Sequence, residues 1–263
     1  MPTFQVFEHQ TLRVGEQGFT QAHFLAFAER PALKYYTVLH RAVRFGQYVG
    51  VLKIGDLTLE ILPKADAAIK PDTNRWREVL IAMLRYCRFL KLETLSSANV
   101  RLRQHSILDL YLELFLQEVE HLLQKGLIKK YRREAKQTIA LKGQLQFAKQ
   151  LQHNLTHQER FYTRHETYDF DHLLHQMLWQ ALCITQNMAT TPTLRTRAQQ
   201  LKARFPKVTI QSITQRHFDR LPKNRQTQRY QDALDIARLL ILNFQPDVQG
   251  GQHSLLALLF DMN

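Results

Sequence analysis

Cysteine and glycine are scarce in this chain of 263 residues, and long apolar runs are absent from its sequence. The two cysteines, Cys87 and Cys183, both lie in helical apolar patterns, which excludes a disulfide framework or a cysteine-based zinc site. We expect both to pack in the core. The nine glycines are scattered, and neither GxxxxGK[ST] nor GxGxxG occurs, so we expect the chain to bind no nucleotide itself.

No apolar run approaches the roughly 18 residues that cross a bilayer. The N-terminus MPTFQVFEHQ also lacks the basic and apolar regions of a signal peptide. These features predict a soluble, cytoplasmic protein with no membrane partner. Basic residues outnumber acidic ones by 36 to 23, and the resulting charge of +13 favours nucleic acid or an acidic protein surface as partner.

The apolar pattern predicts an α+β fold with two domains. Residues 1–70 are expected to form a small β-rich domain, because apolar and polar residues alternate along them. Gly55 and Asp56 separate two such runs in the manner of a hairpin turn, and Thr20 is placed to cap a short helix. Pro71 lies at the predicted boundary, beyond which a helical period begins.

Residues 71–263 are expected to form a mainly helical domain with a projecting basic β element at about 127–167. Apolar residues at i, i+3, i+4 and i+7 indicate helices. Ser106 with Asp109 fits a capping box at the start of one of them, and Gly126 supplies its C-terminal stop. The predicted helices are 73–90, 106–125, 171–189 and 226–244, together with a short helix that TTPT at 190–193 caps and that runs through Arg204. Within the projection we predict strands at 128–133, 137–141 and 160–167, and a short helix near 144–152.

The sequence lacks the clustered carboxylates that hold a nuclease's metal ion. Asp56 and Glu60 precede Lys64 without the acidic-x-Lys pair of nuclease cores, so we predict a structural hairpin there. Two histidine pairs have spacings that could meet on a helix face, namely His153 with His157 and His172 with His175. No carboxylate or cysteine completes either pair, so we predict packing or solvated histidines, no metal and no catalytic residue.

Basic charge is concentrated in two segments. Seven lysines and arginines accompany one glutamate in residues 129–149, a net charge of +6, and ten accompany one aspartate in residues 195–229, a net charge of +9. A solvated surface is the ordinary explanation of such runs. In the first segment the charges alternate with apolar side chains, which favours a half-buried hairpin that presents basic groups to nucleic acid or to an acidic protein cleft. These apolar residues are Tyr131, Ile139, Leu141, Leu145 and Phe147.

Five segments resemble the McrC family, the second subunit of the McrBC modification-dependent restriction systems. They are EILPKA at 60–65, MLRYCRF at 83–89, the run 107–151 ending in LKGQLQFAKQL, RFYTRHETYDFDHLLHQMLWQAL at 160–182, and FDMN at 260–263. The resemblance implies a partner of McrB, an AAA+ GTPase hexamer that holds the GTP and Mg²⁺, while this chain binds no cofactor. It also implies a finger that enters the ring's pore, stimulates GTP hydrolysis and couples it to cleavage of 5-methylcytosine DNA.

The basic segment matches the family's projection in order and character. The resemblance and the charge together assign partner contacts to Lys129, Lys130, Arg132, Arg133, Lys142, Gly143 and Gln144. The family's Lys-Gly-Arg motif ends in Gln144 here, so a charged donor is missing at this place, and Lys142, Arg132 or Arg133 could replace it.

The nuclease domain that follows FDMN in the family is not among these residues, so we expect that this chain does not itself cut DNA. A truncated, split or natural short form, and a separate nuclease partner, all remain open. A sequence-nonspecific DNA-binding module of a defence system is the second hypothesis, and an unrecognised nuclease is the third. The predicted DNA contacts are Arg195, Arg197, Lys202, Arg204, Arg216, Arg220 and Arg225.

Overall fold

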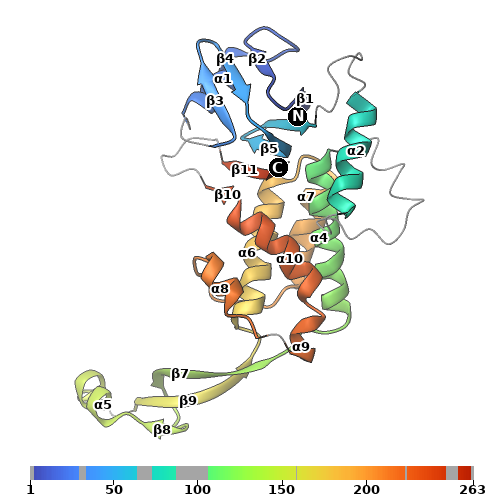
Figure 1. The fold of residues 1–263 in the computed structure, drawn as a ribbon. Helices are drawn as coiled ribbons and strands as arrows, with labels where there is room; N and C mark the ends of the chain where they lie inside the picture. Colours follow the sequence, from blue (N-terminus) through green and yellow to red (C-terminus); the bar gives the residue numbers. More distant parts are fainter. Residues whose placement is uncertain are drawn as a thin grey trace.

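The chain has three parts that follow one another along the long axis of the molecule (Figure 1). A β-rich part lies at one end, a helical body lies in the middle, and a slender projection extends from the other end. The computed structural model describes residues 3–29, 34–63, 73–86, 106–157, 159–222, 224–246 and 254–261. The mixed helix and strand content agrees with the predicted α+β class.

Two sheets form the β-rich part, one of five strands in the order β1-β6-β5-β11-β10 and one of three in the order β2-β4-β3. Helix α1 (Gln21–Ala28) begins where predicted, because the Thr20 side chain accepts a hydrogen bond from the backbone N–H of His23. The strands are β1 (Thr3–Phe7), β2 (Thr11–Arg13), β3 (Tyr36–Leu39), β4 (Ala42–Phe45), β5 (Tyr48–Ile54), β6 (Leu57–Leu62), β10 (Phe244–Gln245) and β11 (Leu255–Asp261).

The central strands of the large sheet are buried on both faces. Val49 and Val51 join the core of the helical body, whereas Leu52 and Ile54 join a second core beneath the small sheet. The alternation along β5 therefore separates two apolar cores, because each face of the sheet is covered. The predicted hairpin turn at Gly55 is confirmed, since it connects β5 to β6 with a φ of 55°.

The helical body packs four of its helices, α4, α6, α7 and α10, around the larger core. Helix α4 begins at Ser106, whose side chain accepts the N–H of Asp109 at 3.1 Å, and is followed by Gly126 at a φ of 81°, so both predicted ends are confirmed. The helices are α2 (Thr73–Tyr86), α4 (Ile107–Gln124), α6 (Leu173–Met188), α7 (Pro192–Arg204), α8 (Gln215–Asp219), α9 (Arg225–Gln228) and α10 (Gln231–Leu242). No helix within the described ranges is long and apolar enough to span a membrane.

The single helix predicted over 226–244 is wrong, because the chain forms α9 and α10 with a break between them. The hydroxyl of Thr227, in α9, donates to the backbone carbonyl of Pro222 at 2.6 Å, and this hydrogen bond stabilises the short helix. Tyr230 follows the break, and its side chain is completely buried. The break therefore directs a large aromatic side chain into the body, where an uninterrupted helix was expected.

Two buried charges join the large sheet to the helical body. Lys53 Nζ donates to the carbonyl of Met188 at 2.8 Å, at the C-terminal end of α6, and burial lowers the pKa of this lysine. Glu60 accepts the N–H of Ile107 at 2.9 Å at the start of α4 and pairs with Arg77 at 3.3 Å. Each charge has the sign that favours the helix end it contacts, so Glu60 has a structural role here.

The last strand of the chain completes the sheet that the first strands begin. Strand β11 lies between β5 and β10, with Leu255 opposite Ile54 and Asp261 opposite Tyr48. Gly50 has a φ of 134°, and a Cβ atom there would lie 2.2 Å from the carbonyl oxygen of Leu258, so this close pairing requires glycine. The predicted boundary at residue 70 therefore does not enclose the sheet, which also takes strands from the C-terminal end.

Candidate partner-binding finger

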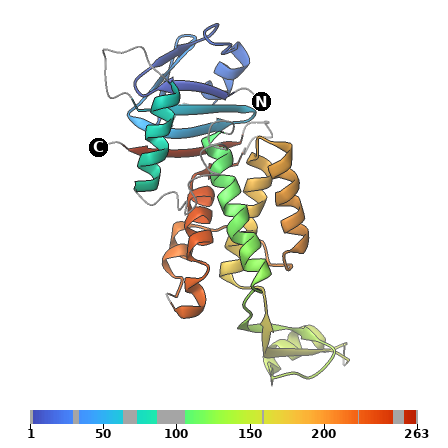
Figure 2. The same cartoon turned by 90° about the vertical axis from the view of Figure 1, so that its right-hand side faces the viewer.

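The projection, which we call the finger and define as residues 129–170, consists of one sheet and one short helix. Its sheet has the order β7-β9-β8, and its elements are β7 (Lys130–Thr138), β8 (Gln144–Leu145), α5 (Phe147–Asn154) and β9 (Phe161–Asp169). The finger points away from the helical body at the end opposite the β-rich part (Figures 1 and 2). The nine residues of β7 give the finger a length of about 30 Å, at roughly 3.3 Å per residue.

The predicted projection is present, but its elements differ in extent from those predicted. The two strands expected at 128–133 and 137–141 are one continuous strand, because the polar residues between them keep their pairing with β9. Glu134, for example, lies opposite His165. The short helix lies two to three residues later in the chain than predicted, and a short strand precedes it.

A hydrogen-bonded cluster holds the two strands where they leave the body; we call it the root clamp and define it as His172, His175 and Tyr230. The Tyr230 hydroxyl accepts the N–H of Ile128 at 2.9 Å, and His172 Nε2 donates to the carbonyl of the same residue at 3.0 Å. His175 Nδ1 donates to the carbonyl of Phe170 at 2.7 Å, and its Nε2 lies 3.4 Å from the Tyr230 hydroxyl. The clamp therefore fixes both roots of the finger to α6 and α10.

Both histidines of the root clamp are held in the neutral form. Burial, with a further contribution from His172, lowers the pKa of His175 to about 3, and burial also lowers the pKa of His172. Neutral His175 donates from Nδ1 and can accept the Tyr230 hydroxyl proton at Nε2, which matches its two contacts. The prediction of packing histidines is confirmed for this pair, whereas the sequence did not indicate the link to Tyr230.

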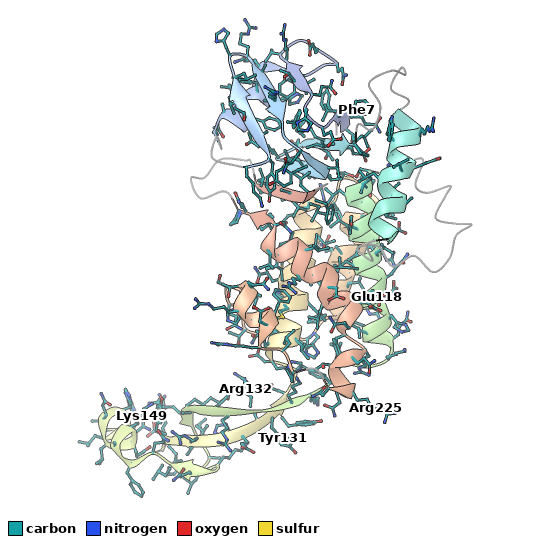
Figure 3. The ribbon with its side chains drawn as sticks, in the orientation of Figure 1. Phe7, Glu118, Tyr131, Arg132, Lys149 and Arg225 are labelled. Atoms are coloured by element: carbon teal, nitrogen blue, oxygen red, sulfur yellow. The ribbon has the colours of Figure 1, made fainter. Side chains whose placement is uncertain are left out.

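Two of the predicted partner contacts are engaged in ion pairs near the root. Arg132 pairs with Glu134, with Asp169 at 3.1 Å and with Asp171 at 3.5 Å. Figure 3 shows Arg132 on the finger strand close to the body. Arg133, on the opposite face of β7, is 80% exposed but pairs with Glu166 on β9 at 2.9 Å.

The two lysines that precede these arginines also contact the finger itself. Lys129 Nζ lies 4.9 Å above the ring of Phe170, within cation–π distance. Lys130 is half-buried, and burial lowers its pKa. Beside them the rings of Tyr131 and Tyr168 lie 4.7 Å apart across the two strands. The basic residues of the root half therefore make contacts within the molecule, while Tyr131 and Tyr168 contact each other and remain exposed.

The remaining predicted contacts lie in the turn that leads into β8, in the tip half of the finger, which we define as residues 139–160. Lys142 and Gln144 are exposed there, and Gln144 lies opposite Arg164 of β9. Gly143 has a φ of 70°, and a Cβ atom would lie 2.4 Å from the carbonyl oxygen of Arg164. Glycine is therefore required at the turn.

The expectation that the finger's apolar residues are half-buried is wrong for most of them. Of the five, only Leu145 is partly buried, while the exposed ones are Tyr131, Ile139, Leu141 and Phe147. The reason is that polar side chains fill the space between α5 and the sheet. Asn154 is buried there, and its side-chain oxygen Oδ1 accepts a hydrogen bond from the Gln137 side-chain amide at 2.6 Å.

The predicted DNA contacts divide between packing and exposed positions. Arg195 donates to the carbonyl of Ala189 at 3.2 Å, Arg197 pairs with Glu120, and Lys202 donates to the side chain of Gln186. The others are exposed, namely Arg204, Arg216, Arg220 and Arg225. Figure 3 shows Arg225 at the end of the body from which the finger leaves.

No group of three metal-ligating side chains occurs among the residues that the structure describes. Cys183 is half-buried, and Cys87 lies outside the described residues. Within that part of the chain, the feature best suited to a function is therefore the finger.

Comparison with known proteins agrees with the residues that suggested a family. The family described as "McrBC 5-methylcytosine restriction system component" matches residues 43–263. The chain belongs to this family. No curated protein matches it.

Two solved structures share the fold of this McrBC family member. A chain of the cryo-EM structure of the Thermococcus gammatolerans McrBC complex is 18% identical, with a TM-score of 0.69, and the match covers 100% of this chain and 84% of that one. A second is a refined half-complex from a tetradecameric assembly of Thermococcus gammatolerans McrB AAA+ hexamers with bound McrC. It is 19% identical, with a TM-score of 0.67 and coverage of 100% and 67%.

Proposed function

We propose that this McrBC family member is a McrC-type subunit that docks its finger on a McrB-like AAA+ GTPase hexamer. The observation that carries the proposal is a finger about 30 Å long that leaves the body and carries exposed side chains. The Thermococcus gammatolerans assembly, which contains McrB AAA+ hexamers with bound McrC, supports it through the shared fold. The GTP and Mg²⁺ belong to the partner subunits in this proposal, and this chain binds no cofactor.

Docking is proposed to stimulate GTP hydrolysis and to couple it to DNA cleavage by a nuclease that acts with this subunit. A cation aimed at a phosphate-hydrolysing site stabilises the charge that develops in the transition state. Lys142 is the best placed of the three replacements considered for the missing arginine, because it is exposed in the tip half. Arg132 and Arg133 already pair with carboxylates near the root.

The test is GTP turnover by the cognate ring with and without this chain, together with size-exclusion chromatography of the mixture. The wild-type chain is expected to form a complex and to raise turnover. The double variant Lys142→Ala, Arg133→Ala is expected to abolish the stimulation. Both side chains are exposed, so folding should be unchanged.

A matched control removes two exposed arginines from the small sheet, Arg13→Ala with Arg44→Ala, and should stimulate turnover like the wild type. No complex and no change in turnover with the wild-type chain would refute the proposed function. Unchanged stimulation by the finger variant would exclude only the two side chains.

A second candidate function is binding of duplex DNA by the exposed arginines of the body. None of the ion pairs found in the described ranges involves the four exposed arginines of the body, namely Arg204, Arg216, Arg220 and Arg225. Their charges are therefore available to phosphate groups. Each phosphate contact should contribute about −0.9 to the slope of log affinity against log salt. A shift of duplex DNA that is undetectable or independent of salt would exclude this candidate.

A further inference from the structure

Helix α5 carries its apolar residues on the outside. Phe147, Leu151 and Leu155 follow one another at spacings of four residues, from the first residue of α5 to the residue just after it, so they line one side of this turn of chain. They are 74%, 63% and 70% exposed. We call these three residues the apolar stripe. Single exposed apolar residues are ordinary, but a contiguous stripe of them indicates a contact surface.

The side of α5 that faces the finger sheet is polar and lies next to the apolar stripe. Gln150 Oε1 accepts the N–H of Tyr162 at 2.6 Å, and Gln150 Nε2 donates to the carbonyl of Arg160 at 2.7 Å. Asn154 is 3% exposed and accepts the side-chain amide of Gln137. A surface helix of a globular protein ordinarily buries its apolar side and exposes its polar side. In α5 the side that faces the sheet is polar and the apolar stripe is largely exposed, so the stripe contributes little to packing within the described part of the finger.

The position of the stripe determines what could cover it. It lies in the tip half of the finger, far from the helical body (Figures 1 and 2). Figure 3 shows Lys149, on the same helix, at the far end of the finger. Ile139 and Leu141, 84% and 60% exposed, belong to the same half. No described residue of the body reaches this stripe, so the surface that fits it is that of another molecule, which receives the end of a narrow arm.

The charge of the finger favours a different molecule over a second copy of this chain. Residues 129–169 contain nine basic and four acidic side chains, a net charge of +5. Two copies joined through their stripes would bring these like charges together, which is unfavourable. Lys142, Lys149 and Arg160 lie in the same half as the stripe, so a complementary surface combines an apolar patch with acidic surroundings.

We propose that the apolar stripe is the docking surface that seats the finger against an apolar wall with acidic surroundings inside the McrB-like ring. This proposal rests on the proposed function and names the contact that holds the finger in place. Lys142 would act on hydrolysis, whereas Phe147, Leu151 and Leu155 would supply affinity. Apolar side chains at a buried contact commonly provide most of the binding energy, and surrounding charges mainly provide orientation and association rate.

The test uses the full chain, fluorescently labelled and titrated with the cognate ring assembled on a non-hydrolysable GTP analogue. The double variant Phe147→Ser, Leu151→Ser is expected to bind about 100-fold more weakly, or roughly tenfold per side chain. Ala148→Ser with Gln152→Ser is the matched control, because both residues are exposed on α5 at the same spacing, and it should bind like the wild type. Circular dichroism and thermal unfolding should be the same for all three proteins.

The outcomes separate the two proposals. A wild-type chain that does not bind the ring overturns the proposed function and the stripe with it. A wild-type chain that binds, with the Phe147→Ser, Leu151→Ser variant binding equally well, overturns the stripe alone. A concentration-dependent dimer in light scattering that this variant abolishes, with ring binding intact, assigns the stripe to a second copy and also overturns the proposal.

The acidic part of the proposed wall has its own test. Lys149→Glu should weaken ring binding severalfold at low salt, and the difference should shrink as salt rises, because surface charges are then screened. Equal binding by this variant and the wild type at low salt would contradict the proposal that the wall has acidic surroundings.

Discussion

The two halves of the finger use similar residues in opposite ways. Near the root, Arg132 and Arg133 pair with carboxylates, and Tyr230 is completely buried. In the tip half, Lys142 is exposed, and Phe147 is 74% exposed. Arg132 and Arg133 are thus paired within the molecule, and Tyr230 packs in the body beneath the root, whereas Lys142 and Phe147 are available to a partner.

This contrast explains why the run of basic residues in the sequence does not by itself identify the residues that contact a partner. The +6 segment runs continuously from root to tip, and five of its seven basic residues lie in the root half. A basic side chain that lies next to carboxylates of the neighbouring strand forms ion pairs within the molecule, as Arg132 and Arg133 do. A basic side chain further toward the tip, such as Lys142, lies beyond those carboxylates. Position relative to β9, which follows some 30 residues later, decides which basic residues are available.

Removal of an aromatic side chain should distinguish the two halves most strongly. Tyr230→Ala is expected to lower the free energy of unfolding by about 3 to 5 kcal/mol, because it empties a buried site and breaks the root clamp. Phe147→Ala should change it by less than about 0.5 kcal/mol, because the ring is exposed. Urea unfolding followed by tryptophan fluorescence measures both, and equal effects would contradict the contrast.

Acidification should weaken the root and not the tip. The pKa of folded His175 is about 3, against 6.5 in the unfolded chain, so between these values the unfolded chain binds a proton that the folded chain does not. Stability is therefore fully present above pH 6.5 and declines below it, by about 1 kcal/mol between pH 7.5 and 5.5. Urea unfolding at both pH values should show this loss.

The histidine responsible can be identified by two variants. His175→Gln should reduce the dependence on pH, because it removes one of the two clamp histidines whose pKa burial lowers, His172 being the other. His157→Gln, an exposed histidine of the tip half, is the control and should retain the full dependence. A dependence that survives His175→Gln unchanged would assign it to another group.

The smallest expected effect compares neighbouring arginines on β7. Arg133→Ala should lower the free energy of unfolding by less than about 0.5 kcal/mol, because its pair with Glu166 is mostly exposed. Arg132→Ala should cost about 1 kcal/mol, because it leaves Glu134, Asp169 and Asp171 without their shared cation. Denaturation curves at low salt measure the difference. A larger effect from Arg133→Ala than from Arg132→Ala would contradict the conclusion that Arg132 is the arginine that stabilises the root.

Local patterns predicted the fold where local chemistry determines it. The cap at Ser106, the stop at Gly126 and the turn at Gly55 all follow from residues a few positions apart, and all are confirmed. The projecting basic element was also expected from its charge and from the family resemblance. Its exposed apolar residues were not, because the interior of the finger is filled by Gln150 and Asn154, whose polar pattern resembles a surface.

Contacts between distant residues were beyond the reach of the sequence. Tyr230 contacts Ile128 across 102 positions, and its place at a helix break gave no signal of that partner. The pairing of β11 with β5 joins residues about 200 positions apart. No periodic pattern in the sequence predicts either contact, because each depends on how the chain between the two partners folds.

The pairing of β11 with β5 also constrains the order in which the chain can mature. During synthesis, strands β5 and β6 emerge about 200 residues before residues 255–261, which form the neighbour of β5. Until then one edge of β5 lacks its backbone partners and its apolar residues lack Leu255 and Ala257. The sheet that these early strands begin is therefore complete only after a segment about 200 positions further along the chain has been made.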